Sequence, residues 1–221
     1  MSHPEVMEIP VAPEPEFQVL GATGRRHAAV PAIDFDVYVS EPSGRRVYAI
    51  ALRAQVMIEP ARRKYDSETR EKLVELFGPP ERWATTTHSL VWHQADALVP
   101  GFTGSTTFHV ALPATFDVEV ASSKYLYGLL DGEVPLAFNF NGTVHYRGDD
   151  GGLQLSLIPW SCSAEFRLPV ATWRELIEHY YPRTGWIALR EETLLALQRE
   201  KASRALPTVD ACVAELLEER G

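Results

Sequence analysis

The sequence predicts an α+β fold: a mostly antiparallel β-sandwich or curved sheet with a C-terminal helical cap. Across residues 33–158 apolar side chains recur mainly at every second position, which is the period of a half-buried strand. Across residues 161–221 the period changes to about 3.6, which is that of an amphipathic helix. Turns of hairpin length join most segments before this change, and such turns favour antiparallel pairing.

Length and composition predict one large domain. The chain has 221 residues, 45% of them hydrophobic, which is enough for one sizeable core. Residues 1–16 are rich in proline and glutamate and are expected to form a flexible arm, followed by a single β-rich domain at residues 17–221.

Charge and targeting signals narrow the range of partners. The formal charge of -9 argues against nucleic acid as a partner, because a nucleic-acid surface needs clustered Lys and Arg. The sequence shows neither a secretion signal nor an apolar run of membrane length. We therefore expect a cytoplasmic protein that has no membrane partner.

The first two strands are predicted from rows of apolar residues. One row is Ile33, Phe35, Val37 and Val39. A second strand is expected at residues 47–59, with an inward row of Tyr48, Ile50, Leu52, Ala54, Val56 and Ile58. The turn residues Glu-Pro-Ser-Gly at 41–44 predict that the two strands form a hairpin.

The middle of the chain contains one predicted helix. A short inserted helix is expected at residues 66–77, because Leu73, Val74 and Phe77 have helical spacing before Gly78. Residues 99–104 are expected to form a loop between two strands. Residues 116–120 are expected to form a further strand, which places Asp117 and Glu119 on one face.

The C-terminal part is predicted to be helical over residues 172–219. Thr172 and Glu175 match a capping box, in which each side chain satisfies a free backbone N–H at the helix start. Thr208, directly after Pro207, is the predicted cap of the last helix.

The residues that could carry chemistry form no complete motif. Cys162 and Cys212 are too few for a disulfide framework, and no catalytic residue, metal or cofactor is expected. The histidines include no H-x-H or H-x-x-x-H pair. One alternative stays open: the fold could bring His93, His109 and His145 together as a metal site, a small-molecule site or an active site.

Aromatic residues are the more informative candidates. Side chains of this kind dominate the energetics of cores and of protein interfaces alike. The partner-binding surface is expected near the turns that flank them, at Trp83, Trp92, Phe102, Tyr125 and Tyr127. Packing in the core is the competing interpretation for the same residues.

Several short motifs together resemble an uncharacterised family of actinobacteria, the high-GC Gram-positive bacteria. They are residues 48–53 (YAIALR), 58–60 (IEP), 76–78 (LFG), 99–105 (VPGFTGS), 123–125 (SKY), 131–133 (DGE) and 182–186 (PRTGW). Members of that family tend to be encoded beside structural and maturation genes of uptake [NiFe]-hydrogenases. The resemblance implies an accessory role, and it carries over no catalytic residue.

A second resemblance covers only residues 166–201. A strand, the segment LPVA at 168–171, a helix and then GWIAL at 185–189 are similar to the end of the SecB export chaperone. The insertion at 61–83 and the tail after residue 202 depart from the SecB pattern.

These observations predict a non-enzymatic, chaperone-like accessory or assembly factor. Its expected protein partner is a hydrogenase subunit or the maturation machinery. Besides the histidine site, the remaining alternative is a general holdase similar to SecB, which implies a homo-oligomer.

Overall fold

The computed structural model describes residues 12–114, 120–185, 187 and 189–219. The chain divides into two compact units, Met1–Arg183 and Thr184–Gly221. The first unit contains all eight strands of the described residues, and the second contains two helices.

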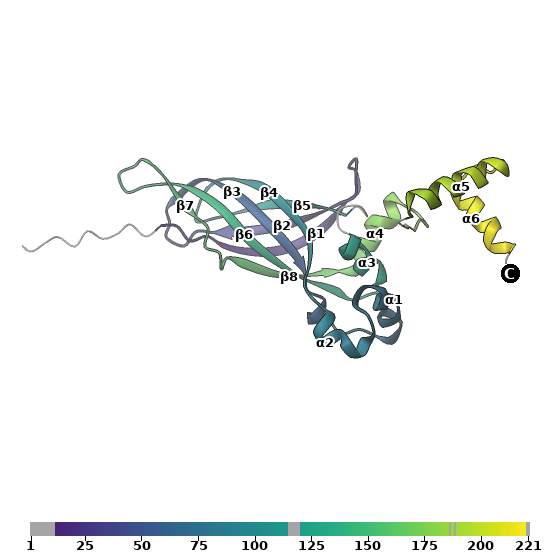
Figure 1. Ribbon diagram of the computed structural model, residues 1–221. Coiled ribbons are helices and arrows are strands. Elements are labelled where there is room, and N and C mark those ends of the chain that lie inside the picture. The colour runs from purple at the N-terminus through teal and green to yellow at the C-terminus, as the bar shows by residue number, and fades with distance from the viewer. Residues whose placement is uncertain (1–11, 115–119, 186, 188, 220–221) are drawn as a thin grey trace, which may run out of the picture. The chain divides into compact units, whose positions relative to one another are not determined.

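Two antiparallel sheets make up most of the first unit (Figure 1). A three-stranded sheet has the order β1 (Glu16–Arg25), β2 (Ala32–Ser40), β5 (Ser105–Pro113). A five-stranded sheet has the order β4 (Leu90–Thr103), β3 (Arg46–Ile58), β6 (Glu133–Arg147), β7 (Leu153–Leu157), and β8 (Ser163–Pro169) also pairs with β6. The predicted α+β class, mostly antiparallel sheet with C-terminal helices, is confirmed.

The core lies between the two sheets. The predicted rows of β2 and β3 are buried from Ile33 to Val39 and from Ile50 to Ile58, and each Val, Leu, Ile or Phe among them contributes about 1.5–3 kcal/mol to folding. Aromatic rings join the layers: Phe35 meets the ring of Phe138 at 5.2 Å and Phe17 stacks on Phe140 at 4.4 Å between centroids. The sheets therefore form a sandwich.

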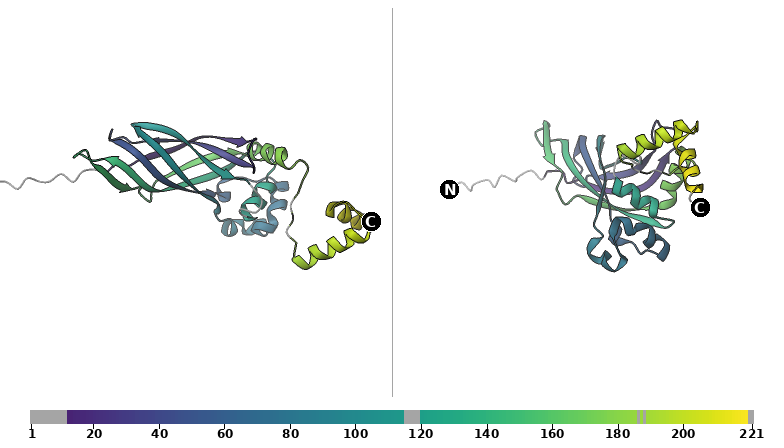
Figure 2. Two further views of the ribbon diagram at one scale, coloured as in Figure 1. Left: turned by 90° about the horizontal axis from the view of Figure 1, so that it is seen from above. Right: turned by 45° about the vertical axis from the view of Figure 1, so that its right-hand side comes forward.

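Four helices of the first unit gather at one end of the sandwich (Figures 1 and 2). They are α1 (Ser67–Phe77), α2 (Trp83–Thr86), α3 (Val120–Gly128) and α4 (Val170–Tyr180). A 3-10 turn at Pro60–Arg62 lies between β3 and α1, and a second at Pro80–Arg82 lies between α1 and α2. The Asp66 carboxylate caps α1 by accepting from the backbone N–H of Thr69 at 2.8 Å, and α4 is tied to β1 because the Tyr180 hydroxyl donates to the Arg25 carbonyl oxygen at 2.9 Å.

The second unit consists of α5 (Glu191–Ser203) and α6 (Val209–Glu218). Thr208 caps α6 as predicted, with its hydroxyl accepting from the backbone N–H of Ala211 at 3.1 Å. Cys212 is fully buried, and Arg204 forms ion pairs with Glu200, Glu215 and Glu219. No helix in the described part of the chain is long and apolar enough to cross a membrane.

The predicted hairpin between the first two strands is wrong. β2 pairs with β1 and β5, whereas β3 pairs with β4 and β6, so the two strands belong to different sheets of the sandwich. The buried carboxylate of Glu41 accepts from the backbone N–H groups of Ser43 and Arg45 at 3.1 and 3.0 Å. The backbone N–H groups of this bend therefore find their hydrogen-bond acceptor within the bend itself. The chain can pass from one sheet to the other without leaving these groups unpaired.

Two details within the five-stranded sheet also differ from expectation. Tyr48 is exposed because a bulge between Val47 and Ala49 shifts the inward row by one residue. Residues 99–103 are strand rather than loop, and only Gly104, with φ at +78°, makes the turn. Pro100 is tolerated because β4 is an edge strand.

Two further expectations concern the segments that precede α3 and α4. The capping box is wrong, since α4 already begins at Val170, Pro169 is its N-cap and no side chain caps it. The strand expected at 116–120 falls almost entirely outside the described residues, where Asp117 and Glu119 also lie. Residues 1–11 of the predicted arm lie outside them as well, whereas Pro13 and Pro15 are buried.

Candidate functional site

The five aromatic residues predicted to bind a partner lie mostly in the interior. Trp83, Trp92, Phe102 and Tyr125 are buried, and only Tyr127 is substantially exposed, at 39%. Their role in partner binding stays a prediction. The other four side chains expose at most 9% of their surface to solvent. The ring of Tyr127 meets that of Trp173 edge-on at 5.5 Å.

Tyr125 belongs to a hydrogen-bonded cluster between the helices and the sheet. Its hydroxyl lies 2.7 Å from that of Tyr65, which donates to the Pro60 carbonyl oxygen at 2.7 Å. Burial raises the pKa of both phenols above the ordinary value. Both hydroxyls therefore remain protonated near pH 7 and take part in the packing between the helices and the sheet.

The three histidines of the alternative site are far apart. His93 on β4 pairs with Val56, and His145 on β6 pairs with Ala49. Because positions 56 and 49 lie on the same strand, about 23 Å separates these pairs. His109 lies in the other sheet, with Nδ1 at 2.8 Å from Asp36 Oδ1. No group of three or more metal-ligating side chains occurs among the described residues.

The most unusual surface feature is β7, which carries its apolar residues on the solvent side. Leu153, Leu155 and Leu157 are 65, 60 and 77% exposed. Gln154 and Ser156 lie on the core side, where they pair with the buried Tyr146 and Val144 of β6. A half-buried strand normally has the opposite polarity. These leucines are the clearest described candidates for contact with another molecule.

The leucines of β7 form one wall of a broad apolar face. Leu98 on β4, Ala51 on β3, Thr143 on β6 and Leu157 on β7 pair in succession across four strands. Leu98 is 73% exposed. With strands spaced about 4.8 Å apart, the Leu98 and Leu157 walls stand about 15 Å apart. We call this surface, with Ala49 and Ala51 between the walls, the outer trough.

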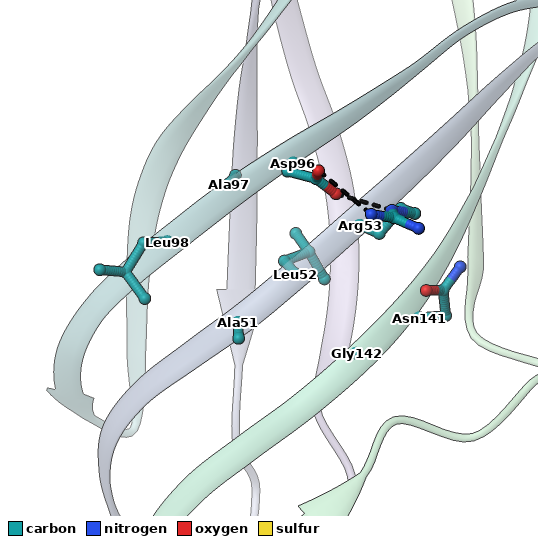
Figure 3. A pocket seen from close by; sticks show the side chains of 8 residues that line it. All are labelled: Ala51, Leu52, Arg53, Asp96, Ala97, Leu98, Asn141 and Gly142. Carbon is teal, nitrogen blue, oxygen red and sulfur yellow. Dashed lines mark hydrogen bonds and ion pairs between the residues drawn. The ribbon is translucent and has the colours of Figure 1, made fainter.

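A depression of about 500 Å³ marks the β4 side of the outer trough (Figure 3). Leu98 and Asn141 flank it, and Ala51 and Gly142 lie at its floor. Arg53 and Asp96 cross its rim as an ion pair with N–O distances of 2.7 and 3.2 Å. The hydrogen bond between them raises the pKa of Arg53 and lowers that of Asp96.

Gly142 keeps this floor low. Its φ is +142°, and a Cβ added there would lie 2.0 Å from the carbonyl oxygen of Ala51. Only glycine permits so close an approach of β6 to β3. The depression is thus formed by small residues at the centre of the sheet.

The outer trough is suited to binding rather than to bond chemistry. Its walls are leucines, and its floor combines Ala49 and Ala51 of β3 with Thr143 and His145 of β6. The ion pair between Arg53 and Asp96 at its rim is already satisfied. The leucines of β7 were not among the binding residues predicted from the sequence, although apolar and polar residues alternate visibly at 153–157. The alternation shows which residues share a face, but it does not show that this face lies outside the sandwich.

Comparisons with known proteins give a family and distant structural matches. The model of a family of unknown function, DUF6084, matches residues 12–221. No curated protein matches the chain.

Three of the matching solved structures show how low the identity is. The solution structure of a protein described as late embryogenesis abundant matches at 15% identity, with 73% of each chain covered and a TM-score of 0.30. A β-glucosidase from Kluyveromyces marxianus matches at 10% identity, over 70% of this chain and 15% of the enzyme, with a TM-score of 0.26. A protein described as ApaA from Bordetella pertussis matches at 13% identity, over 71% and 93% of the two chains, with a TM-score of 0.24. Scores this low carry no argument about function.

Proposed function

The chain belongs to DUF6084, a family of unknown function, and from this premise we propose that it is a non-enzymatic accessory protein that binds another polypeptide in the outer trough. The observation that carries the proposal is the set of leucines on the solvent face of the five-stranded sheet. Contiguous exposed apolar surface of this kind costs solubility and marks interaction sites.

The dimensions of the outer trough favour an amphipathic helix as the occupant. The leucine walls stand about 15 Å apart, and a helix with its side chains is about 10–12 Å across. An extended strand, at about 4.8 Å per strand, would leave much of the alanine floor uncovered. A helix that presents an apolar stripe to Ala49 and Ala51 would contact both walls at once.

Charge at one end of the outer trough specifies the partner further. Val47 and Tyr146 face the core, so their neighbours Arg46 and Arg147 fall on the outer face, beside Leu153. Both arginines are exposed, and neither forms an ion pair with a carboxylate of the described residues. The chain as a whole carries a formal charge of -9. We expect the bound helix to place Asp or Glu at this end.

For the client we propose a [NiFe]-hydrogenase subunit or a component of its maturation machinery. The resemblance to actinobacterial proteins encoded beside hydrogenase genes supports this choice. The face of an unassembled subunit that later becomes an interface is apolar, and a transient partner could shield it. The outer trough has the shape and polarity for that task.

The test is affinity capture from a hydrogenase-producing actinobacterial host, followed by binding measurements with the purified client. We expect a hydrogenase or maturation protein to be captured. Leu98→Asp, which charges one wall, and Ala51→Phe, which fills the floor, should each weaken binding about 10- to 100-fold, because one buried leucine contributes about 1.5–3 kcal/mol. Leu20→Asp is the matched control, since Leu20 is an exposed leucine on β1 of the other sheet.

Each outcome decides one part of the proposal. Capture without any hydrogenase or maturation protein refutes the client. A captured client that binds the Leu98→Asp and wild-type proteins equally refutes the outer trough. Suppression of aggregation of many unrelated unfolded chains, with no preference for the client, would instead favour a general holdase.

A further inference from the structure

The free edge of β7 is unusually well suited to pairing with another strand. Edge strands are commonly protected by charged residues, proline or a bulge. β7 has none of these, because its sequence is LQLSL and its pairing with β6 has no register shift. β4, the edge at the other side of the sheet, carries Asp96 and Pro100.

The backbone of β7 shows which groups are free at that edge. The Ile158 N–H donates to the Gly142 carbonyl oxygen at 3.0 Å, so Ile158 points its backbone groups toward β6. Because backbone direction alternates along a strand, Gln154 and Ser156 also point toward β6. The N–H and C=O groups of Leu153, Leu155 and Leu157 therefore point to the open edge.

One buried polar atom on β7 lacks a partner. Ser156 Oγ is buried and forms no hydrogen bond in the described structure. Such an atom costs about 1–3 kcal/mol. Two residues away, Gln154 Oε1 accepts from the Tyr146 hydroxyl at 3.1 Å, which leaves the Gln154 amide N–H groups available to donate.

We propose that two copies of this chain pair through β7, antiparallel, about a twofold axis at Leu155. In this register Leu155 lies opposite its own copy and Leu153 lies opposite Leu157 of the other copy. These are the residues whose backbone groups point outward, so about six new ladder hydrogen bonds form. Gln154 of one copy then faces Ser156 of the other in a non-hydrogen-bonded pair, where side chains approach most closely.

The register therefore satisfies two independent requirements. It pairs all three outward leucines with leucines on the solvent side, and it gives the unpartnered Ser156 Oγ a donor on the core side. A shift by one residue would place leucine opposite glutamine or serine and would break both matches. The interface is short, at the low end of the range for specific complexes, so the dimer should dissociate on dilution.

The proposal does not depend on the client. Sedimentation equilibrium of the full chain over a concentration series should show a species of twice 24.7 kDa that dissociates on dilution. Leu155→Lys should raise the dissociation constant about tenfold or more, because it places two like charges opposite each other at the axis. Leu20→Lys is the matched control on the other sheet and should leave the dimer unchanged.

Cysteine cross-linking tests the register itself. In a Cys162→Ser background, Leu155→Cys should form a disulfide-linked dimer on mild oxidation, since hydrogen-bonded pairs have Cα atoms about 5.5 Å apart. Leu153→Cys alone should not cross-link, but a mixture of Leu153→Cys and Leu157→Cys proteins should. A monomer at every concentration, or a dimer that neither Leu155→Lys weakens nor Leu155→Cys cross-links, overturns the proposal.

Discussion

Replacing Gly142 by alanine tests the close contact that forms the floor of the outer trough. The new Cβ would lie 2.0 Å from the Ala51 carbonyl oxygen, on a residue with φ at +142°. Backbone strain at such an angle costs about 1–3 kcal/mol. The overlap must also push β6 from β3, which breaks one or two ladder hydrogen bonds of about 1 kcal/mol each. We expect a total loss of about 2–5 kcal/mol and a fall in Tm of about 10 °C.

Urea denaturation followed by tryptophan fluorescence measures this loss, because Trp83, Trp92 and Trp173 are buried in the first unit. Gly104→Ala is the matched control. Gly104 also has positive φ, at +78°, but a Cβ there would meet nothing within 4 Å. It should cost only about 1–2 kcal/mol, because strain at positive φ is then the only contribution. Equal losses for the two variants would show that the approach of β6 to β3 needs no glycine, and our account of the floor would be refuted.

Three further predictions concern stability. Glu41→Ala should lower the free energy of unfolding by about 2–3 kcal/mol in urea titrations, because two backbone N–H groups lose their buried acceptor; a loss as small as that of the exposed Glu14→Ala would contradict this. Leu73→Ala should cost about 2–5 kcal/mol, whereas Val74→Ala beside it, at a 40% exposed position, should cost less than about 0.5 kcal/mol. Burial raises the pKa of Tyr125, so above about pH 10 the unfolded chain loses this proton first and stability falls. In Tyr125→Phe the free energy of unfolding should fall less steeply as the pH rises through about 10. If it falls as steeply as in the wild-type protein, the Tyr125 phenol is not the cause.

Much of the local structure could be predicted because it depends on neighbouring residues. The alternation at 33–39 and 50–58 identified the buried rows of β2 and β3, and the spacing of Leu73 and Phe77 identified α1. Thr208 was a correct cap because capping requires only one side chain and an amide three residues on. The Thr172–Glu175 motif failed because α4 begins two residues earlier, at Val170, immediately after β8.

The candidate site could not be predicted in the same way. The aromatic residues named from the sequence are mostly buried, because packing between two sheets uses the same side chains that interfaces use. His93 and His145 pair with positions of β3 about 23 Å apart, and that separation depends on which strands become neighbours.

By itself, the sequence determined the class of fold, the rows of residues that share a face, and several element ends. Only the tertiary structure decided that β2 and β3 lie in different sheets and that the leucines of β7 point away from the core. The physical reason is that periodicity is a property of a single segment. The choice of partner strand, and of the face that turns inward, depends on contacts between segments far apart in the chain.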